Sequence, residues 1–327
     1  MQKRVIIDTD PGVDDALAIL LALLSPELRV EAITTVNGNV SLEQATKNAA
    51  FLLDLLDPEP RPILAKGAAR PLRKRAFRAQ FVHGSDGLGD LDRLKNPDGS
   101  PRYPGPELPP RTLEATEVLL DLLKRYPGEL SLIALGPLTN LAAALAADEE
   151  RIKGLREVIA MGGAIRVPGN ITPAAEFNIF VDPHAACRVF ESGLPIKLIP
   201  LDVTEKVFLG SHAIENLARE MGPPLGTFLS DSTARAVEHT EQVKGMGGIY
   251  LHDPLAVGVA IRPSLVETTP LHVDVETRRG VTEGMTLADL RGIRDDLKQP
   301  ANMDVALEVA VEEFLPFFKE RLCPGSS

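Results

Sequence analysis

Short apolar runs rich in β-branched residues alternate with segments of helical apolar spacing along most of the chain. The strand-like runs are Arg4–Ile7, Val30–Val36, Leu130–Leu135, Glu157–Met161 and Ile196–Leu201. The helical segments that follow or separate them are Asp14–Leu24, Leu42–Leu56, Leu138–Ala147 and His184–Glu191. A strand–helix–strand rhythm is typical of parallel sheets, because each helix returns the chain to the edge where the next strand starts. We therefore predict an α/β fold with a mostly parallel central sheet and helices on both faces.

No composition shift or linker divides the chain, so residues 1–327 are predicted to form one large domain. Towards the C-terminus, Val273–Thr277 and Met303–Val309 predict two more strands, and Val311–Leu322 predicts a last helix. The longest segment without clear periodicity is Lys66–Pro110, and long loops of this kind tend to be functional or disordered. Its basic run, Arg70–Arg78, is interpreted as a solvated face rather than a phosphate site.

Composition excludes several classes of protein. The chain has 35 basic and 46 acidic residues, a net charge of −11, which argues against nonspecific binding of nucleic acid. The longest apolar run, Ala16–Leu24, is far shorter than the roughly 20 residues of a membrane span, and we see no signal-peptide pattern. Cys187 and Cys323 give neither a disulfide framework nor a zinc spacing. We expect a cytoplasmic protein that binds neither membrane nor nucleic acid.

Four carboxylates crowd the junction between the first predicted strand and the first predicted helix, in the stretch DTDPGVDD. Helix capping accounts for Asp14 and Asp15, since a helix N-terminus favours anions. Capping does not account for Asp8 and Asp10, which end a buried strand and would repel the other two carboxylates. A bound cation removes this repulsion, and oxygen ligands without Cys or His favour Ca²⁺ or Mg²⁺ over zinc. The stretch therefore predicts a metal site.

Polar or small residues also follow the other predicted strands. They are Asn37 and Asn39, Gly136 and Asn140, Gly162 and Gly163, and Asp202. Ligands of open α/β sheets bind beyond the carboxyl ends of the strands, so we expect all these residues to converge at one edge. Amides and carboxylates around a cation suit a polyhydroxylated ligand such as a sugar.

Two further stretches fit such a site. In AAEFNI, Glu176 and Asn178 lie two residues apart, so an extended segment would point both side chains to the same side. In LHDP, His252 and Asp253 come just before an apolar helix, a pattern that is also typical of a helix N-cap with its neighbour.

Taken together, these motifs resemble those of the inosine–uridine-preferring nucleoside hydrolase family. The most specific is DTDPGVDDALAI, starting at Asp8. It is followed, in the family's order, by ITTVNGN (33–39), VHGSDGLG (82–89), ALGPLTNLA (134–142), MGG (161–163), GNITPAAEFNIFVDP (169–183) and LHDP (251–254). The match extends from about residue 3 to about residue 315. Several motifs in the same order make a chance resemblance very unlikely.

The resemblance implies a calcium site and a general base. Asp10, Asp15 and Asp253 match the family's calcium-ligating carboxylates, and Leu135 matches the residue whose backbone carbonyl completes the set. Asp10 also matches the general base that acts on the calcium-bound water. Asp8 belongs to the same signature and is expected to orient the residues around it.

The resemblance also implies the substrate contacts. The residues that match those holding the ribose hydroxyls are Asp14, Asn39, Asn170, Glu176 and Asn178. His83 and His252 match two histidines near the base and the 5′ side. The acid that serves the departing base stays open among His252, His239 and Tyr250, because residues 223–250 depart from the family's pattern.

The implied activity is hydrolysis of the N-glycosidic bond of ribonucleosides to free base and ribose, in nucleoside salvage or catabolism, with a pyrimidine or mixed base preference. The resemblance also implies that this chain forms a homodimer or a homotetramer. Two alternatives remain. A DxD phosphatase would use Asp8 and Asp10, but it expects Thr or Val where this chain has Gly12. A nucleoside- or calcium-binding protein without catalysis would not need the intact set of Asp10, Asp15, Asp253 and His252.

Overall fold

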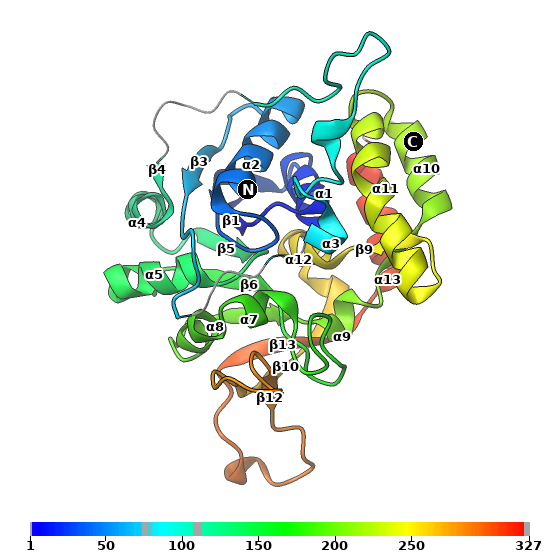
Figure 1. The fold of residues 1–327 in the computed structure, drawn as a ribbon. Helices are drawn as coiled ribbons and strands as arrows, with labels where there is room; N and C mark the ends of the chain where they lie inside the picture. The colour runs from blue at the N-terminus through cyan, green and yellow to red at the C-terminus, as the bar shows by residue number, and fades with distance from the viewer. Residues whose placement is uncertain (1, 74–77, 79, 107–112, 324–327) are drawn as a thin grey trace.

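The computed structural model describes residues 2–73, 78, 80–106 and 113–323, which are arranged around one central sheet (Figure 1). The strands of this sheet, in the order in which they lie side by side, are β10 (Val266–Leu271), β13 (Met303–Val309), β7 (Ile196–Ile199), β6 (Glu157–Met161), β5 (Leu130–Ala134), β1 (Lys3–Thr9), β2 (Leu28–Thr35), β3 (Ile63–Lys66) and β4 (Leu113–Glu114). Only β10 runs antiparallel to its neighbour. The predicted α/β fold with a mostly parallel sheet is confirmed.

Helices cover both faces of the sheet and enclose two cores (Figure 1). The first core includes residues of α1 (Val13–Leu23), α2 (Leu42–Leu56), α10 (Ser211–Met221), α11 (Leu225–Lys244), α12 (His252–Ile261) and α13 (Val311–Leu322). The second includes residues of α4 (Ala115–Arg125), α5 (Thr139–Ala147), α6 (Glu149–Ile152) and α8 (Pro183–Phe190). Strand β1 alternates between them, since Val5 and Ile7 belong to the first core and Ile6 to the second.

Shorter elements surround the carboxyl edge of the sheet or extend beyond it. They are α3 (Gln80–His83), α7 (Phe177–Val181), α9 (Leu201–Thr204), the pair β8 (Phe208–Gly210) and β9 (Gly248–Tyr250), and the pair β11 (Val273–Val275) and β12 (Thr286–Ala288). Three single 3₁₀ turns lie at Leu91–Arg93, Pro263–Leu265 and Asp295–Leu297. The strand predicted at Val273–Thr277 is therefore real but belongs to a separate hairpin.

One local prediction needs correction, and another is confirmed. The segment around Glu176 is not extended: Glu176 caps α7 by accepting hydrogen bonds from the backbone N–H groups of Asn178 and Ile179, which turns the chain into a helix. The segment Lys66–Pro110 contains α3 and one 3₁₀ turn and is otherwise irregular in its described part. Four residues of the basic run Arg70–Arg78, at positions 74–77, lie outside the described residues.

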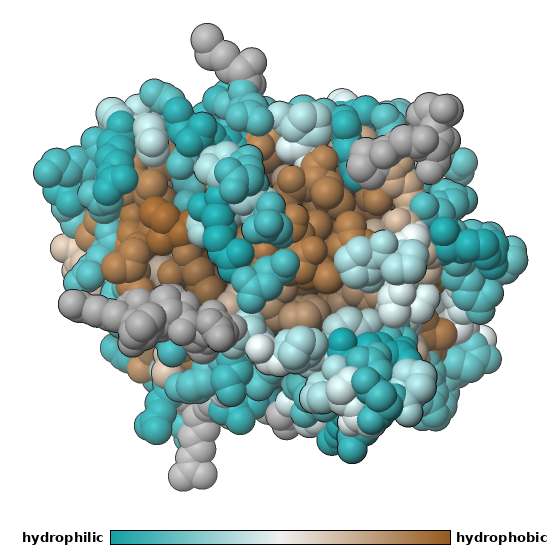
Figure 2. Space-filling model, turned by 90° about the horizontal axis from the view of Figure 1, so that it is seen from above, coloured by the Kyte–Doolittle hydropathy of each residue, from teal (hydrophilic) through white to brown (hydrophobic). Residues whose placement is uncertain are grey.

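The surface matches the acidic, polar composition. Seen from above Figure 1, hydrophilic side chains form most of the rim of the molecule, and apolar side chains gather in two areas between them (Figure 2). Among the helices that the structure describes, none is long and apolar enough to cross a bilayer.

Candidate active site

The polar residues that follow the parallel strands meet at one edge of the sheet, as predicted. Beyond β2, the backbone N–H of Asn39 donates to Asp10 Oδ2 at 2.5 Å. Beyond β5, Asn140 Nδ2 donates to Asp8 Oδ1 at 2.7 Å. These contacts place the ends of β1, β2 and β5 around the two aspartates of the first strand, because the carboxyl ends of parallel strands share an edge.

Asp10 is fully buried between two backbone segments that only glycine allows to come so close. A Cβ atom on Gly38 would lie 1.9 Å from Asp10 Oδ2, and one on Gly136 would lie 2.4 Å from Asp10 Oδ1. Among the described residues, Oδ1 has no hydrogen-bond partner. A buried, unpaired carboxylate oxygen is costly, so this atom is available to a ligand or a proton.

Three carboxylates from two helices gather beside Asp10. Asp14 and Asp15 lie in the first turn of α1 and Asp253 in the first turn of α12, and one oxygen of each lies within 4.8 Å of the others. Asp15 also has a structural role, since its Oδ2 accepts from the Gly12 N–H at 3.0 Å and from Asn39 Nδ2 at 3.0 Å. Capping thus accounts for Asp15 in part but does not explain the other carboxylates.

The electrostatics of this group favour a cation. Burial raises the pKa of Asp10 and of Asp253 well above the usual range, and the charges of neighbouring aspartates raise both further. Burial also raises the pKa of Asp14 and of Asp8 to about 6. No lysine or arginine within the described ranges forms an ion pair with any of these carboxylates. Negative charge that the protein leaves uncompensated is the setting in which a bound cation is most favourable.

The donor set consists of oxygen atoms, which suits a hard ion. The three carboxylates that approach one another are those of Asp14, Asp15 and Asp253, whereas the sequence prediction placed Asp10 in the set instead of Asp14. Asp10 is nevertheless close enough to raise the pKa of Asp253 by its charge. The predicted fourth ligand, the Leu135 carbonyl oxygen, accepts from Asn178 Nδ2 at 2.7 Å, and a carbonyl oxygen has a second lone pair available.

A cavity of about 250 Å³ opens beside the carboxylates. The predicted site residues that line it are Asp14, Asn39, His83, Leu135, Asn170, Glu176, Asn178, His239, His252 and Asp253. Asp10 and Asp15 are fully buried and do not line it. These residues come from seven of the predicted motifs or segments. The fold therefore places residues that are far apart in the sequence around one cavity.

Part of the cavity wall is held by backbone hydrogen bonds. The Glu176 carboxylate accepts from the N–H groups of Gly163 at 3.0 Å, Asn178 at 2.9 Å and Ile179 at 3.1 Å. Burial nevertheless raises the pKa of Glu176 to about 7. Asn170 Oδ1 accepts from the Phe177 N–H at 2.9 Å, so the side-chain amino group of Asn170 is the part left for a ligand.

Two histidines at the cavity are neutral near pH 7. Burial lowers the pKa of His83 to about 4, and its Nδ1 accepts from the Val13 N–H at 3.1 Å, so its proton lies on Nε2. Burial lowers the pKa of His252 to about 3, with further lowering by the charge of Lys244, and its Nδ1 lies 2.8 Å from Thr204 Oγ1. Each can offer a hydrogen bond as a neutral imidazole but holds no spare proton.

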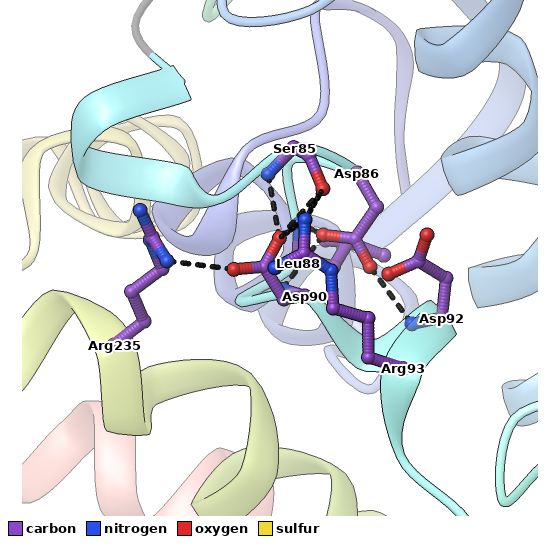
Figure 3. A network of polar contacts seen from close by, with 7 residues as sticks. All are labelled: Ser85, Asp86, Leu88, Asp90, Asp92, Arg93 and Arg235. Atoms are coloured by element: carbon purple, nitrogen blue, oxygen red, sulfur yellow. Dashed lines mark hydrogen bonds and ion pairs between the residues drawn. The ribbon is translucent and has the colours of Figure 1, made fainter.

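A loop anchored to α11 follows His83. Asp86 accepts from the backbone N–H groups of Leu88, Asp90 and Asp92, and the Asp90 carboxylate forms an ion pair with Arg235 of α11 at 2.7 Å (Figure 3). Asp86, Asp90 and Asp92 form the second acidic group of the described residues, and the donors above bond the carboxylates of Asp86 and Asp90. It fixes the loop that follows His83 against the helix that carries His239.

Sequence reasoning missed four polar residues of the site. Glu205, Thr240 and Lys244 line the cavity, and the Thr204 hydroxyl contacts His252 Nδ1. Thr204 and Glu205 lie just after Asp202, which the pattern of polar residues after strands had singled out. Lys244 carries no such signal, because it lies in the region that departs from the family's motifs.

Comparison with known proteins supports the implied family. The family described as inosine-uridine preferring nucleoside hydrolase matches residues 5–316. The pyrimidine-specific ribonucleoside hydrolase RihA of Salmonella arizonae is 38% identical over 323 residues, 98% of this chain and 99% of the relative. Among solved structures, a plant nucleoside hydrolase has a TM-score of 0.87 at 35% identity, covering 99% of both chains. A purine-preferring ribonucleoside hydrolase from Gardnerella vaginalis has a TM-score of 0.85 at 37% identity, covering 98% of both.

These matches cover the chain almost from end to end and confirm the resemblance drawn from its motifs. They leave no support for the phosphatase alternative. The chain therefore belongs to the inosine-uridine preferring nucleoside hydrolase family, a family of enzymes that act on N-glycosyl bonds.

Proposed function

We propose that this protein hydrolyses the N-glycosidic bond of ribonucleosides with the help of one Ca²⁺ ion, releasing free base and ribose. The observation that carries the proposal is the group of buried, uncompensated carboxylates beside a cavity lined by Asn39, Asn170 and Asn178. Carboxylates hold a hard cation, and amides bind sugar hydroxyls. The family membership supplies the class of bond that is cleaved.

The proposed ion ligands are Asp10, Asp15, Asp253 and the Leu135 carbonyl, with Asp14 beside them. The residues fit the ion because their charge is uncompensated and Asp10 Oδ1 is unpaired among the described residues. When bound, Ca²⁺ would lower the pKa of a water molecule and hold it near the sugar. Asp10 is the proposed base that accepts a proton from this water, since its Oδ1 has no hydrogen-bond partner among the described residues and can take the proton.

Cleavage of the bond between C1′ and the base leaves positive charge on the sugar and sends the electron pair to the base. Glu176 and the carboxylates around Asp14 give the sugar end of the cavity a negative potential that stabilises the positive charge. Asp14, Asn39, Asn170 and Asn178 are proposed to bind the ribose hydroxyls and fix the orientation of the ring. His83, His239 and His252 are proposed to face the base.

Base preference is proposed to be pyrimidine or mixed. A pyrimidine-specific relative is 38% identical and a purine-preferring one 37%, so overall similarity does not separate the two classes. The residues that separate them belong to the base end of the cavity, which includes His239, Thr240 and Tyr250.

The test is release of free ribose from a panel of nucleosides that contains uridine, cytidine, inosine and adenosine. Ribose release that depends on Ca²⁺ supports the proposal, and the relative rates give the base preference. Saturable binding of nucleosides without ribose release would instead favour the noncatalytic binding protein and contradict the proposed hydrolysis.

Removal of calcium is expected to destabilise the protein. At a concentration 100-fold above its Kd, a ligand specific for the folded state adds about 2.7 kcal/mol to the free energy of unfolding, which for a chain of this size raises the Tm by about 5 °C. Differential scanning calorimetry with excess chelator and with excess Ca²⁺ measures the difference.

The increase in Tm on calcium binding is also expected to depend on pH. Without the ion, Asp8 and Asp14 have pKa values raised to about 6, so the folded state binds more protons than the unfolded state between about pH 4 and 6. The stability of the calcium-free protein then falls as the pH rises through this window, and the Tm gain from Ca²⁺ should be larger at pH 7 than at pH 5. No calcium-dependent Tm change at pH 7, with Mg²⁺ tested in parallel, would contradict the calcium site.

His252→Ala is expected to separate substrates by their leaving group. Loss of one well-placed hydrogen-bond donor costs about 10²-fold in rate where charge develops. We expect a loss of about this size with uridine, whose base departs as a poorly stabilised anion. p-Nitrophenyl riboside, whose leaving group is a stable anion, should lose less than about tenfold. Steady-state kinetics on both substrates measures the effect.

Equal losses on both substrates would show that His252 positions the substrate rather than serving the leaving group. The same comparison with His239→Ala then tests the alternative donor, which lies on α11 and lines the same cavity.

A further inference from the structure

One wall of the cavity carries a lysine whose charge the proposed mechanism has not used. Lys244 is the last residue of α11, and its Nζ lies 3.4 Å from Glu205 Oε1 and 4.3 Å from the centroid of the Tyr250 ring. Tyr250 in turn stacks on His252, with ring centroids 5.5 Å apart and an angle of 26° between the planes. All four side chains line the cavity, and together we call them the leaving-group wall.

The leaving-group wall is built from fixed parts. Thr204 and Glu205 are consecutive residues at the end of α9, and they hold His252 and Lys244 respectively. Tyr250 ends β9 and packs edge-on against Phe208 of the paired strand β8, with centroids 5.1 Å apart. The C-terminal end of α11 also favours a cation, because its last carbonyl groups carry partial negative charge.

Lys244 is the only lysine or arginine among the described residues that line the cavity. Partial burial lowers the pKa of Lys244, but the Glu205 charge and the contact with Tyr250 outweigh that effect and raise the pKa overall. The side chain therefore keeps its proton at neutral pH. Its ammonium group lies over the Tyr250 ring, which in turn stacks on His252.

This charge would be unfavourable beside the sugar, which becomes positive during cleavage, and favourable beside the base, which becomes negative. The carboxylates of Asp14, Asp253 and Glu176 mark the sugar end, whereas Lys244 lies with His252 and Tyr250 on the leaving-group wall. The cavity thus has a group of carboxylates at one end and an ammonium group, paired with Glu205, at the other, an arrangement that suits heterolytic cleavage of a bond across it.

We propose that Lys244 is a catalytic residue of the base end, where its ammonium group stabilises the negative charge of the departing base. The inference rests on the proposed ribonucleoside hydrolysis. In that step the C1′–N bond breaks, its electron pair goes to the base nitrogen, and water supplies the new C1′ oxygen. Lys244 transfers no proton, and the base anion takes its proton from solvent after release. Glu205 holds the ammonium group in place.

The test uses the full-length calcium-loaded enzyme with two substrates, uridine and p-nitrophenyl riboside. Lys244→Met removes the charge and keeps most of the side-chain length, and Lys244→Arg restores a charge. Lys153→Met is the matched control. The Lys153 side chain is 42% exposed and paired with Glu149, against 43% exposed for Lys244, but Lys153 directly follows α6 and does not line the cavity. Circular dichroism and Tm confirm that each variant is folded.

We expect Lys244→Met to lower kcat for uridine by about 10- to 100-fold, less than the 10²–10³-fold typical of a buried donor because Lys244 is partly exposed. With p-nitrophenyl riboside the loss should be below about threefold, since that anion needs little stabilisation. Lys244→Arg should recover most of the uridine rate, and Lys153→Met should leave both rates unchanged.

Equal losses on the two substrates, or no recovery with arginine, would overturn the inference and assign Lys244 a packing role against Tyr250. Unchanged uridine turnover in Lys244→Met would overturn it as well, while leaving the proposed hydrolysis intact. A wild-type enzyme that cleaves neither substrate is a different result, because it contradicts the proposed function itself.

Discussion

Replacing Asp10 by asparagine is expected to lower kcat for ribonucleosides by about 10²- to 10⁴-fold, the usual contribution of a general base. Asparagine is nearly isosteric and keeps one oxygen, which can either accept from the Asn39 N–H or face the ion. What is lost is the ability to take a proton from the attacking water. Steady-state kinetics gives the rate, and titration calorimetry gives the calcium affinity of the variant.

Asp8→Asn is the matched control for this prediction. Asp8 lies in β1, two residues before Asp10, and is also buried, but it is not a proposed ion ligand. Its Oδ1 accepts from Thr34 and Asn140 while its Oδ2 has no partner among the described residues, so an amide can keep both bonds. We expect a loss of less than about tenfold. If Asp10→Asn with calcium bound retains more than about a tenth of the wild-type rate, Asp10 is not the base.

The sequence could predict the sheet and the place of the site because both follow from local rules. Buried parallel strands appear as continuous apolar runs, and their carboxyl ends share one edge of the sheet. Hence Asp10, Asn39 and Asn140, which are far apart in the sequence, could be assigned to one edge before any coordinates were known. The contacts of Asp10 with Asn39 and of Asp8 with Asn140 confirm that reasoning.

Other parts of the site depend on contacts that local rules do not encode. A glutamate two residues before an asparagine has the spacing of a strand, but the Glu176 carboxylate accepts from two N–H groups of α7 as a helix cap instead. A third bond comes from the Gly163 N–H. The leaving-group wall needs α9 and the end of α11 to meet, and nothing in the local sequence indicates that Glu205 will face Lys244. Long-range pairing of single charged residues leaves no periodic signal, and this is why Lys244 was missed.

The ribose end of the cavity predicts strong selection for the 2′-hydroxyl group. We expect kcat/KM for uridine to exceed that for 2′-deoxyuridine by about 10⁴-fold, because a site built to bond a hydroxyl is left with unpaired buried polar groups when the hydroxyl is missing. Asp14, Asn39 and Asn178 are the proposed partners of the 2′- and 3′-hydroxyls, and all three line the cavity. Parallel assays of free sugar release from the two substrates measure the ratio.

The direction of this preference makes the test specific to the site. An electron-withdrawing 2′-hydroxyl destabilises positive charge at C1′, so the deoxynucleoside has the weaker glycosidic bond, and any advantage of uridine must come from the protein. Asp14→Asn weakens a proposed hydroxyl contact. It should lower kcat/KM for uridine more than kcat/KM for 2′-deoxyuridine, so the ratio of the two should fall. Similar turnover of both substrates by the wild-type enzyme would mean that Asp14 and its neighbours bind the ion alone, and that ribose is recognised elsewhere.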